Sequence, residues 1–283
     1  MGVCAAVWGT TWYAVTLQLG AVDAMVSVVY RFSVATALLF LWCVLRRERI
    51  ALTPRQHADT AGLGLFGFTL SYGLTYEAET RVVSAVVAVL FASLAFTNLA
   101  AFRLAFGQRA RPSAWLASAL GAAGVALLSW GEIAEAGGSA SAAQGLALSL
   151  LAVLATAIGN VFAHRAQEAG ASIAASTAWA TLYGTLFLVL YVVASGRPWS
   201  FAATPRYVLS LLYLATLGSV VAFLLYFRVA RSRGYTAASY ILALTPILAM
   251  GMSTLFEAKR WNALDLAGVT VVLAGQWLLL RGR

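Results

Sequence analysis

Long apolar runs are the feature of this sequence that most limits what it can fold into. Runs of about 18 or more mostly apolar residues follow one another along the whole chain, and each is long enough to cross the hydrocarbon core of a bilayer as a helix. The chain is 61% hydrophobic and 10% charged, whereas soluble domains have about 25% charged residues. A soluble core could not cover that much apolar surface. The sequence therefore predicts an all-α, multi-pass membrane protein.

We expect ten membrane-spanning helices, joined by loops that are too short to hold a soluble domain. The expected spans are residues 2–19, 25–45, 58–76, 82–102, 113–131, 143–163, 173–194, 207–227, 234–256 and 263–280. The longest polar connection, residues 131–144, is rich in Gly, Ser and Ala and is therefore flexible. It predicts a first unit at 1–131, a linker at 132–142 and a second unit at 143–283, with five helices in each unit.

The two units carry the same sequence pattern. Thr53-Pro54-Arg55 recurs as Thr204-Pro205-Arg206, 151 residues later, and the same offset pairs glycines and apolar residues without a gap. Because five spans is an odd number, the second copy must enter the membrane with the opposite orientation. Inverted repeats are typical of secondary transporters, whose substrate site lies near the midplane. A duplication that serves only as a structural scaffold is the alternative.

The basic residues of the loops predict how the chain sits in the membrane. With both termini in the cytoplasm, thirteen basic residues fall in inner loops and five in outer loops, while most acidic residues fall on or near the outer side. We therefore expect both termini in the cytoplasm. Arg197 and Arg206 lie outside in this topology because they are the repeat partners of Arg46 and Arg55.

Several classes of partner and cofactor are not indicated. The net charge of +9 does not predict nucleic-acid binding, because the basic residues lie in short loops between spans. Cys4 and Cys43 lie within apolar runs and the two His residues are dispersed, so the sequence predicts neither a metal site nor a disulfide. It has no Walker motif, so we expect no direct use of ATP. We expect no cofactor.

A set of glycines and short motifs is spread over both units. They are Trp8-Gly9-Thr10, Tyr30-Arg31-Phe32, Leu52-Thr53-Pro54, Gly107, Gly121 and Gly124 in the first unit, and Gly159-Asn160, Thr245-Pro246, Gly268 and Gly275 in the second. On these residues each unit resembles one EamA domain of the drug/metabolite transporter superfamily. The resemblance covers essentially the whole chain and implies two inverted five-helix repeats that export small metabolites across a bacterial inner (plasma) membrane. The chain is most similar to the amino-acid exporters, including the aromatic amino-acid exporter.

Two positions depart from the pattern of that family. The family commonly has a proline in its fourth span, and the second unit has Pro246 there, but the first unit has Ala95. This predicts a hinge at Pro246 and none at Ala95. The acidic residue that often follows the loop glycine of the family is Gln108 here and Lys259 in the second copy, so no role is expected for a carboxylate at these positions.

The ionisable residues limit what the protein could carry. We expect Asp23, Glu77, Glu79 and Asp265 close to outer helix ends, where water or lipid headgroups solvate them, and no carboxylate near the centre of a span. Ionisable groups inside the membrane mark ion and proton paths. Without them, a proton relay and a cationic substrate are disfavoured, and without a cluster of Lys and Arg at mid-depth so are phosphorylated sugars. The expected substrate is a small zwitterionic or neutral molecule.

Aromatic and small polar side chains are expected at the middle depth of the spans, where they could line a substrate cavity. The candidates for substrate binding are Trp12, Tyr13, Tyr72, Tyr76, Asn98, Asn160, Trp179, Tyr226, Tyr240 and Thr245. Tyr72 and Tyr76 are four residues apart and share one face of a helix. For each aromatic residue the alternative is helix packing or an interfacial belt, and for the two asparagines it is a hydrogen bond between helices.

Arg31 lies inside its expected span, roughly 9 Å from the outer end. The first expectation for it is snorkelling toward the outer surface. The second is an ion pair with Glu77, Glu79 or Asp265, and the third is binding of a substrate carboxylate.

Small residues recur along the fifth and tenth expected spans. They are Ala117, Gly121, Gly124, Gly268 and Gly275. Because small residues allow close contact between helices, we expect these two spans to pack within the protein. This favours a monomer over a homodimer.

The leading interpretation is a secondary-type transporter, not an enzyme. It would export aromatic and other apolar amino acids and related small metabolites by alternating access between the two inverted repeats. The alternatives are an exporter or facilitator of other small neutral metabolites or drugs, a membrane-embedded enzyme, and a receptor or scaffold. An enzyme would need a nucleophile with a base, or a metal cluster, and the only candidate is His164 beside Arg165 at an inner helix end.

Overall fold

The computed structural model describes residues 2–109, 111–135, 138–238, 240–243 and 245–281, and within these ranges every regular element is a helix. Two of them, η1 and η2, are π-helices. In chain order the elements are α1 (Gly2–Thr16), α2 (Ala24–Leu45), α3 (Pro54–Leu63), η1 (Gly64–Leu70), α4 (Ser71–Glu79), α5 (Ser84–Ala92), α6 (Leu94–Phe106), α7 (Pro112–Glu135), α8 (Ala140–Glu168), α9 (Ile173–Ala194), α10 (Pro205–Ala215), η2 (Thr216–Val221), α11 (Ala222–Arg233), α12 (Tyr235–Ala238), α13 (Tyr240–Ala243), α14 (Thr245–Phe256) and α15 (Ala263–Arg281).

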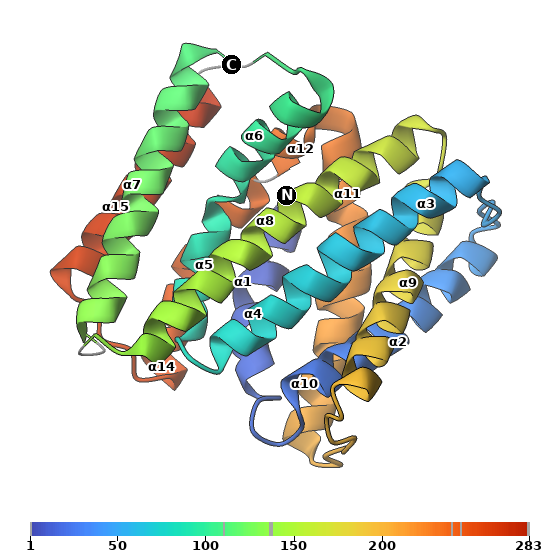
Figure 1. Cartoon of the computed structure of the whole chain (residues 1–283), viewed down its shortest axis with the longest axis horizontal. Coiled ribbons are helices and arrows are strands. Elements are labelled where there is room, and N and C mark those ends of the chain that lie inside the picture. Colours follow the sequence, from blue (N-terminus) through green and yellow to red (C-terminus); the bar gives the residue numbers. More distant parts are fainter. Residues whose placement is uncertain (1, 110, 136–137, 239, 244, 282–283) are drawn as a thin grey trace.

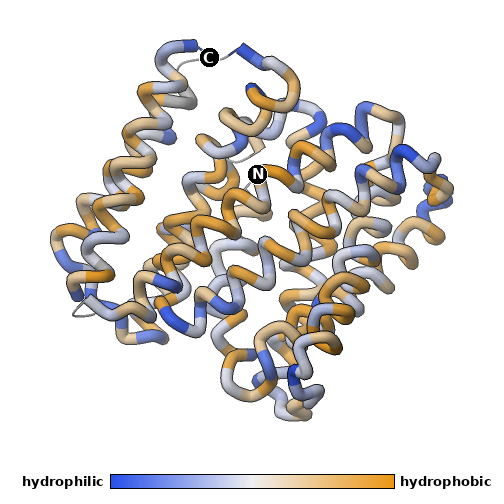
Figure 2. Tube along the Cα trace, in the orientation of Figure 1, coloured by the Kyte–Doolittle hydropathy of each residue, from blue (hydrophilic) through white to orange (hydrophobic). Residues whose placement is uncertain are grey.

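The helices lie side by side in a bundle, and the loops between them gather at its two ends (Figure 1). Loop 46–53 lies at one end and loop 195–204 at the other. Hydrophilic residues concentrate toward these ends, whereas hydrophobic residues run along the helices (Figure 2). Large apolar side chains such as Leu151, Leu190 and Trp277 are exposed on the outside of the bundle. An apolar outer surface between two polar ends is what a bilayer requires.

Five helical segments of the described residues are long and apolar enough to cross a membrane: α2, α7, α8, α9 and the continuous segment from α10 to α11. The bent pair α5 and α6 would make a sixth span, and α14 and α15 are apolar but shorter. The chain is thus a multi-pass helical membrane protein. The arrangement as ten spans stays a prediction.

Equivalent elements recur close to the offset of 151 residues that the sequence shows. The pairs are α2 with α9, α3 with α10, and η1 with η2. Thr53 and Thr204 cap α3 and α10, each accepting a hydrogen bond from the backbone N–H three residues later, and a proline follows each cap. The repeated Thr-Pro-Arg tripeptide therefore forms the same helix start twice.

The π-helix η1 lies where two other helices approach it closely. A Cβ atom on Gly64 would lie 2.7 Å from the carbonyl oxygen of Ala180 on α9, and on the other side η1 meets α8 at Gly159. The hydroxyl of Thr69 donates to the carbonyl oxygen of Gly184 at 2.9 Å. Glycine thus lets the backbones touch, and the threonine adds a hydrogen bond between helices.

The helix α5 ends at Ala92 and α6 continues from Leu94 with a bend of 41°. The hydroxyl of Ser93 donates to the carbonyl oxygen of Leu90 at 2.6 Å, and the side-chain amide of Gln276 donates to the carbonyl oxygen of Ala92. These side chains satisfy carbonyl groups that would accept backbone hydrogen bonds in a straight helix. The span of Ala95 is therefore bent although it lacks a proline, and the expectation that Pro246 alone acts as a hinge stays a prediction.

The helices α7 and α15 run alongside each other at one edge of the bundle (Figure 1). A Cβ atom on Gly124 would lie 2.6 Å from the backbone nitrogen of Val272, and one on Gly268 would lie 2.7 Å from that of Leu128. The expected close contact between these two helices is therefore present within the protein, and it depends on the small residues.

Candidate functional site

A central cavity lies among helices of both halves of the chain. The centre of a water-sized sphere can reach a volume of about 80 Å³ inside it. By the same measure one water needs roughly 10–15 Å³, so the cavity is several times larger than a single water requires. Its wall is mostly apolar. The aromatic residues of the wall are Trp8, Trp12, Tyr72, Tyr76, Phe91, Phe223 and Tyr226. Its polar residues are Thr11, Arg31, Ser71, Thr75, Thr156 and Asn160.

Five of the predicted substrate-binding residues lie in this wall: Trp12, Tyr72, Tyr76, Asn160 and Tyr226. They come from α1, α4, α8 and α11, which are far apart in the sequence. Tyr72 and Tyr76 line the cavity together from one face of α4, because residues four apart share a face. The bundle therefore brings together side chains that the sequence indicated only by their depth.

The helix α1 supplies two tryptophans that differ in how their indole N–H groups are satisfied. The Nε1–H of Trp8 donates to the carbonyl oxygen of Gly218 at 3.1 Å. The Nε1–H of Trp12 is buried and has no hydrogen-bond partner among the described residues, while its ring packs on Phe91 at 5.0 Å between centroids. A buried donor without a partner is costly. An acceptor on a ligand in the cavity would satisfy it.

Arg31 on α2 is only 2% exposed and lies in the cavity wall. Its Nε donates to Ser219 Oγ at 3.0 Å and its Nη1 to Tyr76 Oη at 3.4 Å. The guanidinium also lies 4.7 Å from the centroid of the Tyr72 ring. The expected snorkelling is wrong, because these groups hold the head group inside the bundle. Among the described residues no ion pair joins it to an acidic side chain.

Arg31 gives the cavity a positive charge. The wall has no acidic side chain among the described residues. The two hydrogen bonds of Arg31 use Nε and one position on Nη1, and a guanidinium has five N–H donors. Its planar geometry suits a carboxylate. The electrostatics of the cavity therefore favour a ligand with a carboxylate group over a cation.

Asn160 and Asn98 form a polar contact deep in the bundle. The Nδ2 of Asn160 donates to Asn98 Oδ1 at 3.1 Å and to Tyr226 Oη at 3.0 Å. Asn160 lies in the cavity wall, whereas Asn98 is completely buried and lies behind it. The two roles expected for these residues are a hydrogen bond between helices and lining of the cavity. Asn98 has the first role, and Asn160 has both.

Three other predicted site residues lie away from the cavity wall. Tyr13 stacks on Phe256, with 4.8 Å between ring centroids, because it points away from the face of α1 that lines the cavity. The Nε1 of Trp179 donates to the carbonyl oxygen of Ile50 at 2.8 Å, at a loop. Thr245 is completely buried, and its hydroxyl donates to a backbone carbonyl of α13 at 3.0 Å.

The last two predicted residues are Tyr240 and Pro246. Tyr240 is the first residue of α13, and its side chain is outside the part of the chain that the structure describes. Pro246 is buried and is the second residue of α14 as described. The hinge expected at Pro246 stays a prediction.

Two of the four carboxylates expected at solvated helix ends are buried. Asp265 is completely buried, accepts from the backbone N–H of Asn262 and lies 3.4 Å from Lys259 Nζ. Glu79 is 7% exposed, and neither of its carboxyl oxygens has a hydrogen-bond partner among the described residues. The expectation of solvated carboxylates is wrong for both, because neighbouring segments pack over these helix ends.

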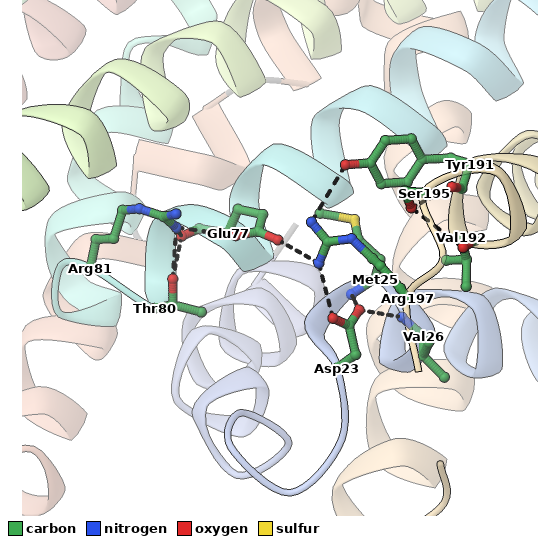
Figure 3. A network of polar contacts seen from close by, with 10 residues as sticks. All are labelled: Asp23, Met25, Val26, Glu77, Thr80, Arg81, Tyr191, Val192, Ser195 and Arg197. Atoms are coloured by element: carbon green, nitrogen blue, oxygen red, sulfur yellow. Dashed lines mark hydrogen bonds and ion pairs between the residues drawn. The ribbon is translucent and has the colours of Figure 1, made fainter. Parts of the chain in front are cut away.

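The other two carboxylates are joined by Arg197 (Figure 3). Its Nη1 lies 2.9 Å from Asp23 Oδ2 and 3.0 Å from Glu77 Oε1. Glu77 also pairs with Arg81, one turn later, at 3.1 Å. Because Asp23 caps α2 and Glu77 lies near the end of α4, Arg197 ties three segments together at one end of the bundle.

A helical bundle with an apolar outer surface and a mostly apolar central cavity is consistent with a membrane transporter of small molecules. The model of the EamA-like transporter family matches residues 1–130 and 143–281. The chain therefore belongs to the EamA-like transporter family. The resemblance seen in the sequence is confirmed at the level of the family.

Curated relatives match along nearly the whole chain. Protein PagO of Salmonella typhimurium (strain LT2) is 23% identical over 283 residues, which cover 98% of this chain and 90% of the relative. The uncharacterized inner membrane transporter YedA of Escherichia coli (strain K12) is 25% identical over 279 residues, which cover 98% and 88%. A solved crystal structure of 16% identity superposes with a TM-score of 0.72 over 99% of this chain and 95% of the other, which shows a shared fold. The protein is a multi-pass membrane transporter of this family.

Proposed function

We propose that this protein is a secondary-type exporter of amino acids with aromatic or other apolar side chains. The observation that carries the proposal is Arg31, a buried guanidinium in the wall of an otherwise mostly apolar cavity. A positive charge beside apolar surface complements a molecule with a carboxylate at one end and an apolar side chain at the other.

Each part of an amino acid has a counterpart in the wall. The carboxylate would bind Arg31 and accept from the indole N–H of Trp12. The side chain would be buried among rings such as Phe91 and Phe223, and apolar burial contributes about 25 cal/mol per Å². The ammonium could lie over the face of an aromatic ring, or donate to the hydroxyl oxygen of Thr11.

We propose that transport occurs by alternating access between two inverted five-helix repeats, 1–131 and 143–283, with both termini in the cytoplasm. The recurrence of Thr-capped helix starts and of π-helices at one offset supports two equivalent halves. Two copies in opposite orientations supply two nearly equivalent states that open to opposite sides.

Transport by purified protein in liposomes tests the substrate. We expect protein-dependent flux of labelled Phe, Leu, Met and Thr, with Phe and Leu preferred because the wall is apolar. Flux of polyamines or nucleosides without flux of any amino acid would sink the proposal and favour the export of other metabolites or drugs.

The variant Arg31→Gln tests the role of the guanidinium. The wild type should bind phenylalanine more tightly than 2-phenylethylamine, which has the same ring but no carboxylate. A hydrogen bond to a charged group contributes about 1.5–3 kcal/mol, so Arg31→Gln should bind phenylalanine about 10- to 150-fold more weakly. The preference for phenylalanine should then disappear.

Arg81→Gln is the matched control, because Arg81 pairs with Glu77 outside the cavity. It should keep the preference for phenylalanine. Equal binding of phenylalanine by Arg31→Gln and the wild type would contradict the proposed role.

A further inference from the structure

Glu79 is a buried carboxyl group that the proposed substrate site does not use. It follows Thr75 by four residues and Tyr76 by three, and both of these line the cavity. Residues at these spacings lie on one face of a helix, so Glu79 lies one turn beyond the cavity on the same face of α4. Neither carboxyl oxygen has a partner among the described residues.

The charged groups that act on Glu79 are few. Arg31 on α2 and Glu257, which follows α14, interact with it electrostatically, and Tyr76 lies one turn before it on its own helix. Glu257 accepts hydrogen bonds from the backbone N–H and the hydroxyl of Ser84, at 3.3 and 2.6 Å. Of the other helices packed on α4, α1 and α5 have no acidic or basic residue, and those of α8 lie at its far end. Arg31 is therefore the one cation among these groups.

A hydrogen-bonded chain runs from Arg31 in the cavity wall through Tyr76, one turn before Glu79, to Gln18. Arg31 donates to the hydroxyl of Tyr76, and that hydroxyl donates to Gln18 Oε1 at 3.0 Å. Gln18 is completely buried, and its Nε2 has no partner among the described residues. Beyond Arg31, the Nε2 of Gln18 and the carboxyl oxygens of Glu79 are thus buried polar groups without partners among the described residues.

We propose that Glu79 is a proton-binding site linked to substrate through Arg31. A carboxylate buried without hydrogen bonds is stable only if it takes a proton or a nearby cation compensates its charge. The ionised Glu79 and the carboxylate of a substrate compete for the charge of Arg31. The substrate therefore binds together with one proton, which is taken from solution onto a carboxyl oxygen of Glu79 and released when the substrate leaves. Export in this form runs down the substrate gradient, because an inward proton gradient opposes a proton that leaves with the substrate.

This linkage has a definite sign. Because binding of substrate favours the protonated form of Glu79, protonation must favour binding of substrate by the same factor. The affinity for substrate rises as the pH falls. At pH values at which the substrate-free protein has lost the proton of Glu79, the Kd for substrate should increase with pH. The increase is at most about tenfold per pH unit, which is the limit for one linked proton. The inference rests on the proposed function, and it places a proton site where the sequence alone disfavoured a proton relay.

The experiment uses wild-type protein in liposomes with phenylalanine as the probe. Counterflow of labelled phenylalanine at equal pH reports binding and exchange without net proton movement. A phenylalanine gradient with a pH indicator inside the vesicles reports the coupled proton. We expect both signals in the wild type, and in Glu79→Gln counterflow without proton movement and with little dependence on pH.

Glu77→Gln is the control on the same helix, since Glu77 is paired with Arg81 and Arg197 at the end of the bundle. It should keep the proton movement that phenylalanine drives. Counterflow in the wild type without proton movement would overturn this inference alone, even if Glu79→Gln cannot be purified. Proton coupling that persists in Glu79→Gln would also overturn it. A wild type without counterflow would overturn the proposed substrate and the inference with it.

Discussion

At the scale of single residues, the cavity is built from side chains that a helix brings to one face. Trp8 and Trp12 are one turn apart on α1 and both line the wall, yet only Trp8 has a hydrogen-bond partner for its indole N–H among the described residues. The same residue type therefore has two roles on one helix. Trp8 holds α1 against η2, and Trp12 is free to bind a ligand.

The variants Trp12→Phe and Trp8→Phe separate these two roles. Trp12→Phe removes a donor that has no protein partner, so the thermal stability of the protein should not fall through loss of a hydrogen bond. The acceptor is the substrate carboxylate, and a hydrogen bond to a charged group contributes about 1.5–3 kcal/mol, so the affinity for phenylalanine should fall by about 10- to 150-fold. Trp8→Phe should instead lower the melting temperature, because it leaves the Gly218 carbonyl without its donor.

Equilibrium binding and thermal unfolding in detergent measure the two effects. The reverse result, with Trp12→Phe unstable and Trp8→Phe defective only in binding, would exclude this assignment.

The depth of a residue along a span could be predicted from the sequence, but its surroundings could not. Tyr72, Tyr76 and Asn160 are aromatic or polar at mid-depth, and the structure brings them to one cavity. Arg31 and Glu79 were expected near water because they lie toward span ends. Both are buried, since neighbouring helices cover them. A charged residue within an apolar run was the signal that pointed to Arg31.

At the scale of the elements, Arg197 connects segments that are separate in the sequence. It lies in the loop after α9 and pairs with Asp23 at the start of α2 and with Glu77 near the end of α4. Arg81, in the turn after α4, shares Glu77 and donates to Gln144 Oε1 at the start of α8 at 3.2 Å. Loss of Arg197 therefore removes both ion pairs that hold its loop against α2 and α4, whereas loss of Arg81 removes one ion pair and a hydrogen bond to α8.

We expect Arg197→Gln to open the cavity toward the end of the bundle at which loop 195–204 lies. An exposed ion pair contributes about 0.2–1 kcal/mol, so loss of two pairs predicts a roughly 2- to 30-fold increase in access. The measure is the rate at which a polar thiol reagent labels Thr75→Cys, in a protein in which Cys4 and Cys43 are changed to Ala. High salt should reduce the difference by screening the pairs in the protein that keeps Arg197.

Arg81→Gln is the control in the same background and should change the labelling rate less. Equal rates in Arg197→Gln, Arg81→Gln and the parent protein would show that these ion pairs do not restrict access.

The start of an element could be predicted from the sequence better than its interior. The Thr-Pro pairs indicate where α3 and α10 begin, because a capping hydroxyl and a proline suit a first turn. The π-helices and the bend at Ser93 leave no such signal. They depend on which backbone carbonyls are satisfied by groups from other helices, such as Gln276, and the periodicity of apolar residues does not report this.

At the scale of the whole molecule, the repeat and the charge of the loops predict which end of the bundle faces the cytoplasm. A reporter tag after Gly138 should lie on the outer side of the membrane, and a tag at the C-terminus should lie inside. Protection of each tag from protease in right-side-out vesicles measures this. A cytoplasmic tag after Gly138 would refute the proposed topology.

The all-helical membrane class could be predicted from the apolar runs, and the family from short motifs spread over both halves. The number of spans was harder to predict, because the expected ten were counted from hydropathy alone. Among the described residues, α14 and α15 are apolar but shorter than a full span, and α5 and α6 form one bent pair. Hydropathy does not report where an apolar run bends or how much of it is one continuous helix.

The paired π-helices also affect which changes in chain length the two halves can tolerate. A π-turn closes its hydrogen bond over one more residue than an α-turn, so η1 and η2 each absorb extra chain without rotating the helix that follows. Deletion of one residue from η1 should restore α-helical geometry and keep Tyr72 and Tyr76 in the cavity wall. Deletion of one residue within α4 would instead turn the rest of that helix by about 100°. Insertions and deletions in related chains should therefore gather at these two segments, where the length of the chain can change while the site keeps its shape.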